Sequence, residues 1–207
     1  MSSLPQTLRQ WANAPRLTAF AAAKTALLLI DFQMESFTGH LPLPEGEPAV
    51  NNAARLVAWA DKHNLAVAHI QHIAASPASP LFTPGGAFTA FHPQVEPSSR
   101  HRVFTKGLPS AFVGAGLDEW LKTAGIDTVL ITGLATHMCV DSTARDALSH
   151  GYRVLVVSDA CASRDLPALG GGMIAHGEMH RAALAALADR FADVLDSAAV
   201  LALPVNA

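Results

Sequence analysis

Four short apolar runs dominate the sequence, and each is followed by a segment with the residue pattern of a helix or a loop. The runs are TALLLID at 25–31, LAVAHIQH at 65–72, DTVLITG at 127–133 and YRVLVVSD at 152–159. They are rich in leucine and β-branched residues and do not alternate strictly between apolar and polar side chains, which is typical of strands buried on both faces. Such strands, separated by helices, predict a parallel sheet that helices cover on both sides.

The segments between the runs carry the signals that begin and end helices. In EPAVNNAARLVAWADKHN, Pro48 stands near a first helical turn and apolar residues recur on one face. GLDEWLKTAG has acidic residues in its opening turn and Gly125 at the position of a C-terminal cap. THMCVDSTARDALSHG is predicted to form a helix that runs from Thr136, as its N-cap, to Gly151. GEMHRAALAALADRF is predicted as the last long helix, and ADVLDS as a final edge strand.

Length and composition limit the organisation of the chain and its partners. With 207 residues, half of them apolar and 15% charged, we expect one α/β domain over residues 1–207 that begins with a lead-in helix over residues 1–23. The net charge of −3 gives no electrostatic footprint for nucleic acid or an anionic membrane surface. No apolar run approaches the roughly 20 residues that span a bilayer. The first residues also lack the layout of a cleaved leader, so we expect a cytoplasmic protein.

Residues 74–102 interrupt the alternation of strands and helices. This segment is rich in Pro, Ser, Gly, Phe and His. Long loops in compact domains are usually functional, so we expect a lid over a site or a contact between subunits. Phe82, Phe88 and Phe91 are the candidate apolar contacts of this loop.

Three reactive side chains are predicted to reach the carboxyl edge of the sheet, where open parallel sheets carry their chemistry. Asp31 ends the first run, Lys106 lies in VFTKGLPSAF, and Cys139 follows DTVLITG. With Thr136 as N-cap, Cys139 falls in the first turn of a helix, where unpaired N–H groups and the helix dipole favour a thiolate nucleophile. The residues alone leave a second interpretation open: Cys139 is a small buried apolar residue, Asp31 caps a turn, and Lys106 is a surface lysine.

The other cysteine, Cys161, stands in a different context from Cys139, in SDACASRDLP just past the fourth run. Two cysteines in such unlike settings do not predict a disulfide framework. We expect Cys161 to have a structural role.

Together these motifs resemble those of the isochorismatase-like cysteine hydrolases. The resemblance rests on LLLIDFQ, VFTKGLPSAF, ITGLATHMCVDSTARDALSHGYRVLVVSDACASRD and EMHRAALAALADRFADV, and it covers about residues 25–200. The block around Cys139 is the most specific of these motifs. The resemblance implies a three-layer α/β/α fold with a mostly parallel six-stranded sheet, and a homo-oligomer that is a dimer or a tetramer.

The resemblance also implies a catalytic triad, which maps onto Asp31, Lys106 and Cys139. In this family a non-proline cis peptide precedes the nucleophile, and the matching bond is Leu134–Ala135. The implied effect is to turn the N–H of Ala135 toward the pocket beside the N–H of Cys139, which makes an oxyanion hole. The expected reaction is attack of Cys139 on an amide, ureide or imide carbonyl of a small molecule, through a thioester.

The second run carries histidines, a residue type that binds metals. Nicotinamidases, which this chain resembles, bind a metal through an Asp-x-His pair after the second strand, and VAHIQHIAASP lacks that pair. We therefore expect no metal, and we expect no cofactor. His72 is predicted to face the substrate pocket and His69 to pack in or beside the strand. Phe37 and Leu134 are the other candidates for the pocket wall.

Two alternatives stand beside the hypothesis of a cysteine amidohydrolase. One is an isochorismatase-type hydrolase that cleaves a vinyl ether with Asp31 and without the cysteine. The other is a catalytically silent binding protein that keeps the fold. The substitution Cys139→Ala separates the three, because it should abolish amide hydrolysis, spare vinyl-ether hydrolysis and leave a binding function unchanged.

Overall fold

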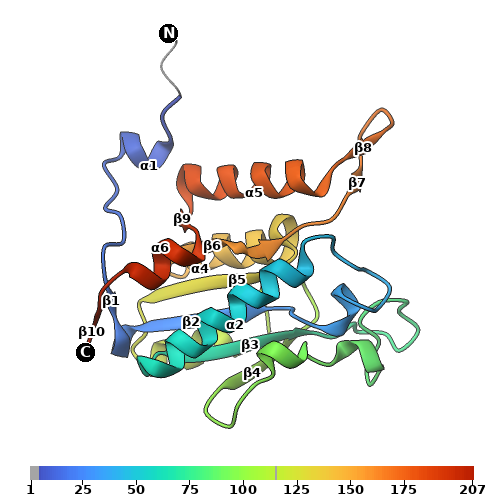
Figure 1. Cartoon of the computed structure of the whole chain (residues 1–207), viewed down its shortest axis with the longest axis horizontal. Coiled ribbons are helices and arrows are strands. Elements are labelled where there is room, and N and C mark those ends of the chain that lie inside the picture. The colour runs from blue at the N-terminus through green and yellow to red at the C-terminus, as the bar shows by residue number, and fades with distance from the viewer. Residues whose placement is uncertain (1–4, 115) are drawn as a thin grey trace.

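A six-stranded sheet with the order β4-β3-β2-β5-β6-β9 forms the centre of the computed structural model, which describes residues 5–114 and 116–207 (Figure 1). All neighbouring pairs of strands in this sheet are parallel. The strands are β2 (Thr25–Ile30), β3 (Ala66–His72), β4 (Arg102–Lys106), β5 (Thr128–Leu134), β6 (Arg153–Ala162) and β9 (Asp193–Leu195). The four apolar runs form β2, β3, β5 and β6, and ADVLDS contains the edge strand β9, so the predicted sheet is confirmed.

Helices cover both faces of the sheet. They are α2 (Gly46–Lys62), α3 (Leu117–Thr123), α4 (Asp141–Ser149), α5 (His176–Arg190) and α6 (Ser197–Ala202). Helices α2 and α6 share one buried cluster with Leu27 and Leu29, and α3, α4 and α5 share the other with Leu28 and Ile30. Since side chains alternate across a strand, every residue of β2 is buried on one face or the other. The predicted three-layer α/β/α fold is therefore confirmed.

Two small sheets complete the chain. Strand β1 (Phe20–Ala21) pairs in parallel with β10 (Val205–Asn206) and so joins segments near the two ends of the sequence. Strands β7 (Leu166–Pro167) and β8 (Met173–Ile174) form an antiparallel hairpin that stands away from the body between β6 and α5 (Figure 1). Its tip contains three glycines, 170–172, all with positive φ.

The N-terminal segment departs from the prediction. Residues 1–4 lie outside the described residues, and the expected helix over 1–23 is reduced to α1 (Leu8–Trp11). Thr7 caps this turn, but none of its residues is buried. Without a buried apolar face a helix gains little from packing, and Pro15 stops any extension because it has no N–H to donate. Among the described residues, no helix is both long and apolar enough to cross a membrane.

Candidate active site

The parallel register of the sheet brings the predicted reactive residues to one edge. Strand β3 ends at His72, directly beside Lys106 at the end of β4. Asp31 follows the last residue of β2, which pairs with Gly133 near the end of β5. Strand β5 then leads into the turn that carries Cys139. The structure thus places four side chains from four strand ends within one small region.

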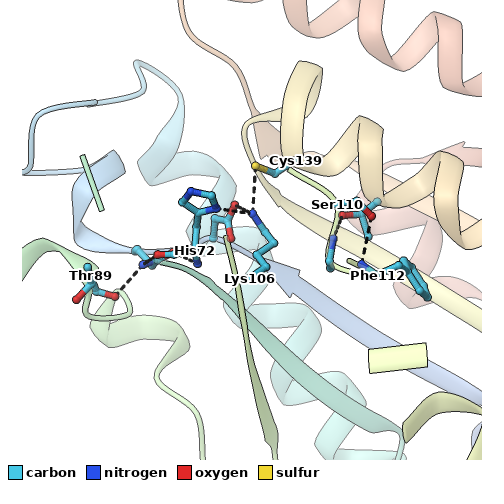
Figure 2. Close-up of polar contacts among 10 residues, drawn as sticks. His72, Thr89, Lys106, Ser110, Phe112 and Cys139 are labelled. Atoms are coloured by element: carbon cyan, nitrogen blue, oxygen red, sulfur yellow. Dashed lines mark hydrogen bonds and ion pairs between the residues drawn. The ribbon is translucent and has the colours of Figure 1, made fainter. Parts of the chain in front are cut away.

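Lys106 is the centre of this group (Figure 2). Its side chain is fully buried, and its Nζ lies 2.7 Å from Asp31 Oδ2, 3.1 Å from His72 Nδ1 and 3.3 Å from Cys139 Sγ. A buried ammonium is stable only when it is paired and hydrogen-bonded, and these contacts supply both. The interpretation of Lys106 as a surface lysine is therefore wrong.

Asp31 has a free acceptor beside the thiol-bearing turn. Its backbone has a φ of 55°, and its side chain is buried. Its Oδ1 has no hydrogen-bond partner among the described residues, whereas Oδ2 accepts from Lys106. Burial raises the pKa of this carboxyl, and the Lys106 ammonium opposes that shift. The arrangement leaves one carboxylate oxygen of Asp31 available to accept a proton.

Cys139 lies in a π-helical turn, Thr136–Val140, that precedes α4. The predicted cap at Thr136 is wrong: Ala135 holds the N-cap position, and Thr136 Oγ1 lies 2.8 Å from His180 Nδ1 of α5. The sequence could not show this bond, because it joins residues that are far apart in the chain.

The electrostatic setting of the thiol also differs from the prediction. Burial and the Asp31 charge raise the pKa of Cys139 to about 12, and Lys106 only partly opposes them. The expected resting thiolate at a helix start is therefore wrong, because the desolvation cost of a charged sulfur outweighs the local dipole. In the free protein the proton stays on the sulfur.

His72 is a neutral neighbour of the ion pair. Burial and the adjacent Lys106 ammonium lower the pKa of its imidazole. Because Nζ can only donate, His72 Nδ1 accepts, and the other ring nitrogen carries the proton. Phe82 packs its ring against this imidazole with centroids 4.9 Å apart.

A pocket of about 80 Å³ opens onto these groups. Its wall is built from the sheet edge, the turn after β5, and four loops: Asp31, Ser36, Leu41, Leu43, His72, Phe82, Pro109, Leu134, Ala135, Met138, Cys139 and Arg164. The Leu134–Ala135 peptide bond, which lies in this wall, is cis. Phe37 does not line the pocket as expected, since its ring packs on His92 with centroids 4.4 Å apart.

Sequence reasoning missed Arg164, which stands just beyond the end of β6. The available signal was a charged residue directly after a buried strand, at the same sheet edge as the other reactive groups. Phe82 was expected only as part of a lid or a subunit contact, and it belongs to the pocket wall.

The long loop between β3 and β4 is fixed to the site by buried polar side chains. Gln33 Nε2 donates to the carbonyls of His72 and Thr89, each at 2.9 Å. Glu35, which is also buried, accepts from the N–H of Phe82 through Oε2 at 3.2 Å and from the N–H of His40 through Oε1 at 2.7 Å. Figure 2 shows Thr89 at the loop end of this network.

The turn after β4 closes another side of the site. In Figure 2 the N–H of Phe112 donates to Ser110 Oγ, at 3.2 Å. The N–H of Ala111 donates to Thr143 Oγ1 of α4 at 3.1 Å, so the turn is tied to the helix that follows Cys139. Pro109 is thereby held in the pocket wall.

A cavity near the N-terminal segment does not match this chemistry. A larger cavity of about 540 Å³ lies between residues 7–17 and the α5–β9 connection, where Arg9 pairs with Asp193 at 2.7 Å. It contains no cysteine and lies away from the carboxyl edge of the sheet, so the pocket beside Cys139 is the candidate active site. Within residues 5–114 and 116–207, no group of three or more His, Cys, Asp or Glu side chains has an arrangement that could hold a metal ion.

Comparison with known proteins gives consistent matches. A family model described as the isochorismatase domain matches residues 25–199. An isochorismatase family protein of Bacillus subtilis is 34% identical over 178 residues, which are 86% of this chain and 98% of that protein. Maleamate amidohydrolase of Pseudomonas putida is 30% identical over 83% of each chain. The crystal structure of an isochorismatase from Pseudomonas putida superposes with a TM-score of 0.87 at 32% identity, covering 95% of this chain and 99% of that one.

Proposed function

The chain belongs to the isochorismatase family of hydrolases, and from that premise we propose that it is a cysteine amidohydrolase. It cleaves a C–N bond of a small amide, ureide or imide through a thioester on Cys139. One observation carries the proposal: the buried Lys106 ammonium lies within hydrogen-bond reach of both Asp31 and Cys139. A nucleophile, a base and a charge-balancing group are the parts that covalent acyl transfer needs.

In the first step Asp31 acts as the base. Its free Oδ1 takes the proton from Cys139 Sγ, and Lys106 balances the negative charge that moves onto the sulfur. Because the pKa of the carboxyl is raised, proton transfer to it is less unfavourable than to an exposed aspartate. The thiolate therefore forms as it attacks the substrate carbonyl.

In the second step the carbonyl oxygen becomes an oxyanion, and we propose that the N–H groups of Ala135 and Cys139 bind it. Removing one such donor typically costs roughly 10²–10³ in rate. The C–N bond then breaks as Asp31 returns the proton to the leaving nitrogen. Asp31 next takes a proton from water as that water attacks the thioester. The C–S bond then breaks, Asp31 gives the proton to the sulfur, and the acid leaves with Cys139 restored as a thiol.

The relatives support hydrolysis but include two chemistries. Maleamate amidohydrolase is an amidase by name, and it favours C–N cleavage here. The other relative, whose crystal structure superposes with a TM-score of 0.87, is named an isochorismatase. For that reason our second candidate is hydrolysis of a vinyl ether with Asp31 and without the cysteine. The position of Cys139 in the pocket, beside the buried ion pair, favours the amidase.

The test is ammonia release from a panel of small amides by the parent protein, Cys139→Ala and Cys161→Ala. Cys161 is the matched control, because it is also buried and free but lies outside this pocket. We expect Cys139→Ala to lose all turnover and Cys161→Ala to keep it. Full amide turnover by Cys139→Ala would contradict the thioester route. Vinyl-ether turnover that survives Cys139→Ala would support the second candidate, and tight binding without turnover would indicate a silent binding protein.

The proposal extends to the setting of the enzyme. We propose a single catalytic domain that needs no metal or cofactor, located in the cytoplasm and assembled as a homodimer or homotetramer. Both cysteines are free, which suits a reducing compartment.

A further inference from the structure

Arg164 is a pocket residue whose hydrogen-bonding capacity is largely unused. Its guanidinium has five N–H donors. Within the described residues, Nη1 donates to the Asp165 carbonyl at 3.3 Å, and the buried Nε has no partner. No carboxylate of the described chain lies within ion-pair distance of this side chain. Among the residues that the structure describes, Nη2 makes no hydrogen bond and Nη1 makes only that one, so the guanidinium keeps donors that a ligand in the pocket can use.

The polar groups near Arg164 either make hydrogen bonds to other residues or carry no charge. The Asp165 carboxylate accepts from the backbone N–H of His176 at 2.6 Å and lies 2.9 Å from its Nδ1. His137 Nδ1 lies 3.0 Å from Ser163 Oγ, while its buried Nε2 also has no partner. Burial and the charge of Arg164 lower the pKa of His137, so this imidazole stays neutral.

The charges that line the pocket do not balance without a ligand. Lys106 and Asp31 offset each other at 2.7 Å, the thiol of Cys139 holds its proton, and His72 is neutral. Arg164 adds one positive charge that no neighbour offsets. In a small, partly desolvated pocket such a charge favours an anion strongly over a neutral molecule of the same shape.

We infer that Arg164 determines substrate specificity and binds the carboxylate of a small substrate whose amide or ureide carbonyl reaches Cys139. The planar guanidinium matches a carboxylate in two parallel hydrogen bonds. Arg164 and Cys139 line the same small pocket, of about 80 Å³, so we take the two groups of the substrate to be only a few bonds apart. The substrate class is thus the short carboxylic acid that carries a terminal amide or ureide. This inference rests on the proposed amidase function for the position of the carbonyl.

The first test compares two amides of equal length, succinamate and the neutral succinamide. We expect the parent protein to prefer succinamate in kcat/KM by roughly 10- to 100-fold, as for hydrogen bonds to a charged group. In Arg164→Met this preference should collapse toward parity, and in Arg164→Lys, which keeps the charge but loses the fork, it should be partly restored. Arg190→Met, which removes an exposed arginine at the far end of α5, is the charge-matched control and should keep the preference.

The second test is independent of turnover. Isothermal titration measures the binding of succinate to Cys139→Ala with and without Arg164→Met. We expect Cys139→Ala to bind succinate with an affinity that falls as salt is added. The double variant with Arg164→Met should bind succinate with an affinity lower by roughly 10-fold or more. Equal binding by both, or no binding by either at millimolar succinate, overturns the inference. If the parent protein hydrolyses no amide but succinate binding still depends on Arg164, only the amidase proposal is overturned. If the parent protein hydrolyses amides but prefers succinamide to succinamate, only the inference about Arg164 is overturned.

Discussion

At Cys139 two influences act in the same direction, and together they decide how the residue reacts. Burial and the neighbouring Asp31 both raise the pKa of the thiol, to about 12, against the opposing charge of Lys106. A cysteine with so high a pKa is a weak nucleophile toward reagents that do not bind the pocket. In the proposed mechanism its reactivity depends on the transfer of its proton to Asp31 at the moment of attack.

We predict that iodoacetamide alkylates Cys139 slowly at neutral pH, with a midpoint well above the 8.5 or so of an ordinary thiol. The sign of each neighbour's effect follows from its charge. Asp31→Asn removes a negative charge and should lower the midpoint, whereas Lys106→Met removes a positive charge and should raise it. Peptide mass spectrometry across a pH series measures both, with Cys161, also at about 12, as internal reference. A midpoint at or below 8.5 in the parent protein would contradict this account.

The gathering of Asp31, Lys106 and Cys139 at one edge of the sheet could be predicted from the sequence, but their electrostatics could not. Lys106 ends a strand, Asp31 and Cys139 follow strands, and parallel strands bring their carboxyl ends to one edge. The raised pKa of the thiol depends on how deeply it is buried, which no local pattern encodes. Arg164 was missed for a related reason, since only the folded pocket shows that it lacks a partner.

At the scale of one element, the end of β5 depends on Gly133. This residue has a φ of 151° and lies between Ile30 of β2 and Cys161 of β6. A Cβ at this position would collide with the backbone carbonyl and the Cβ of Ile30. The strand can therefore approach β2 closely at the site only with glycine here.

We predict that Gly133→Ala destabilises the protein by about 3 kcal/mol or more, from the clash and the strained backbone together. Gly151→Ala is the matched control, because Gly151 also has a positive φ, of 92°, but nothing lies near its added Cβ. That variant should lose only roughly 1–2 kcal/mol. Urea denaturation measures both, and equal losses would show that close packing on Ile30 is unimportant.

The loop between β3 and β4 gives a second prediction at this scale. Glu35 holds the loop through Phe82, which lines the pocket. Glu35→Ala should free residues 79–92, raise KM for a small amide several-fold and lower the stability by roughly 1.5–3 kcal/mol, as for hydrogen bonds to a charged group. Glu96→Ala, at an exposed position of the same loop, is the control. Hydrogen exchange should be faster in 79–92 for Glu35→Ala alone, and equal exchange in both variants would exclude the anchoring role.

The strands were predictable at this scale and the connections were not. Strands that are buried on both faces can be recognised in the sequence as short runs of leucine and β-branched residues. Strands β2 and β5 are examples. The π-helical turn before α4 is held by Thr136 and His180, and the long loop by Gln33 and Thr89. These are tertiary contacts, and the local sequence carries no sign of them.

At the scale of the whole molecule, the β7–β8 hairpin is the feature that the single chain leaves unexplained. It projects from the body (Figure 1), and Leu169 near its tip is fully exposed while Met173 is 63% exposed. Large apolar side chains that gather on a projecting segment are typical of interaction sites. We take a second copy of this chain as the partner, in line with the proposed homo-oligomer.

We predict that the double substitution Leu169→Asp with Met173→Asp converts the oligomer to a monomer, because a charge buried at the contact would have no partner. Size-exclusion chromatography with light scattering, over a range of protein concentrations, measures the mass. Val103→Asp is the control, since Val103 is an exposed apolar residue on β4, at the opposite edge of the sheet. Dissociation by Val103→Asp alone would place the interface at that edge. A parent protein that is monomeric at all concentrations would contradict the proposed homo-oligomer. The apolar side chains of the hairpin would then remain in water.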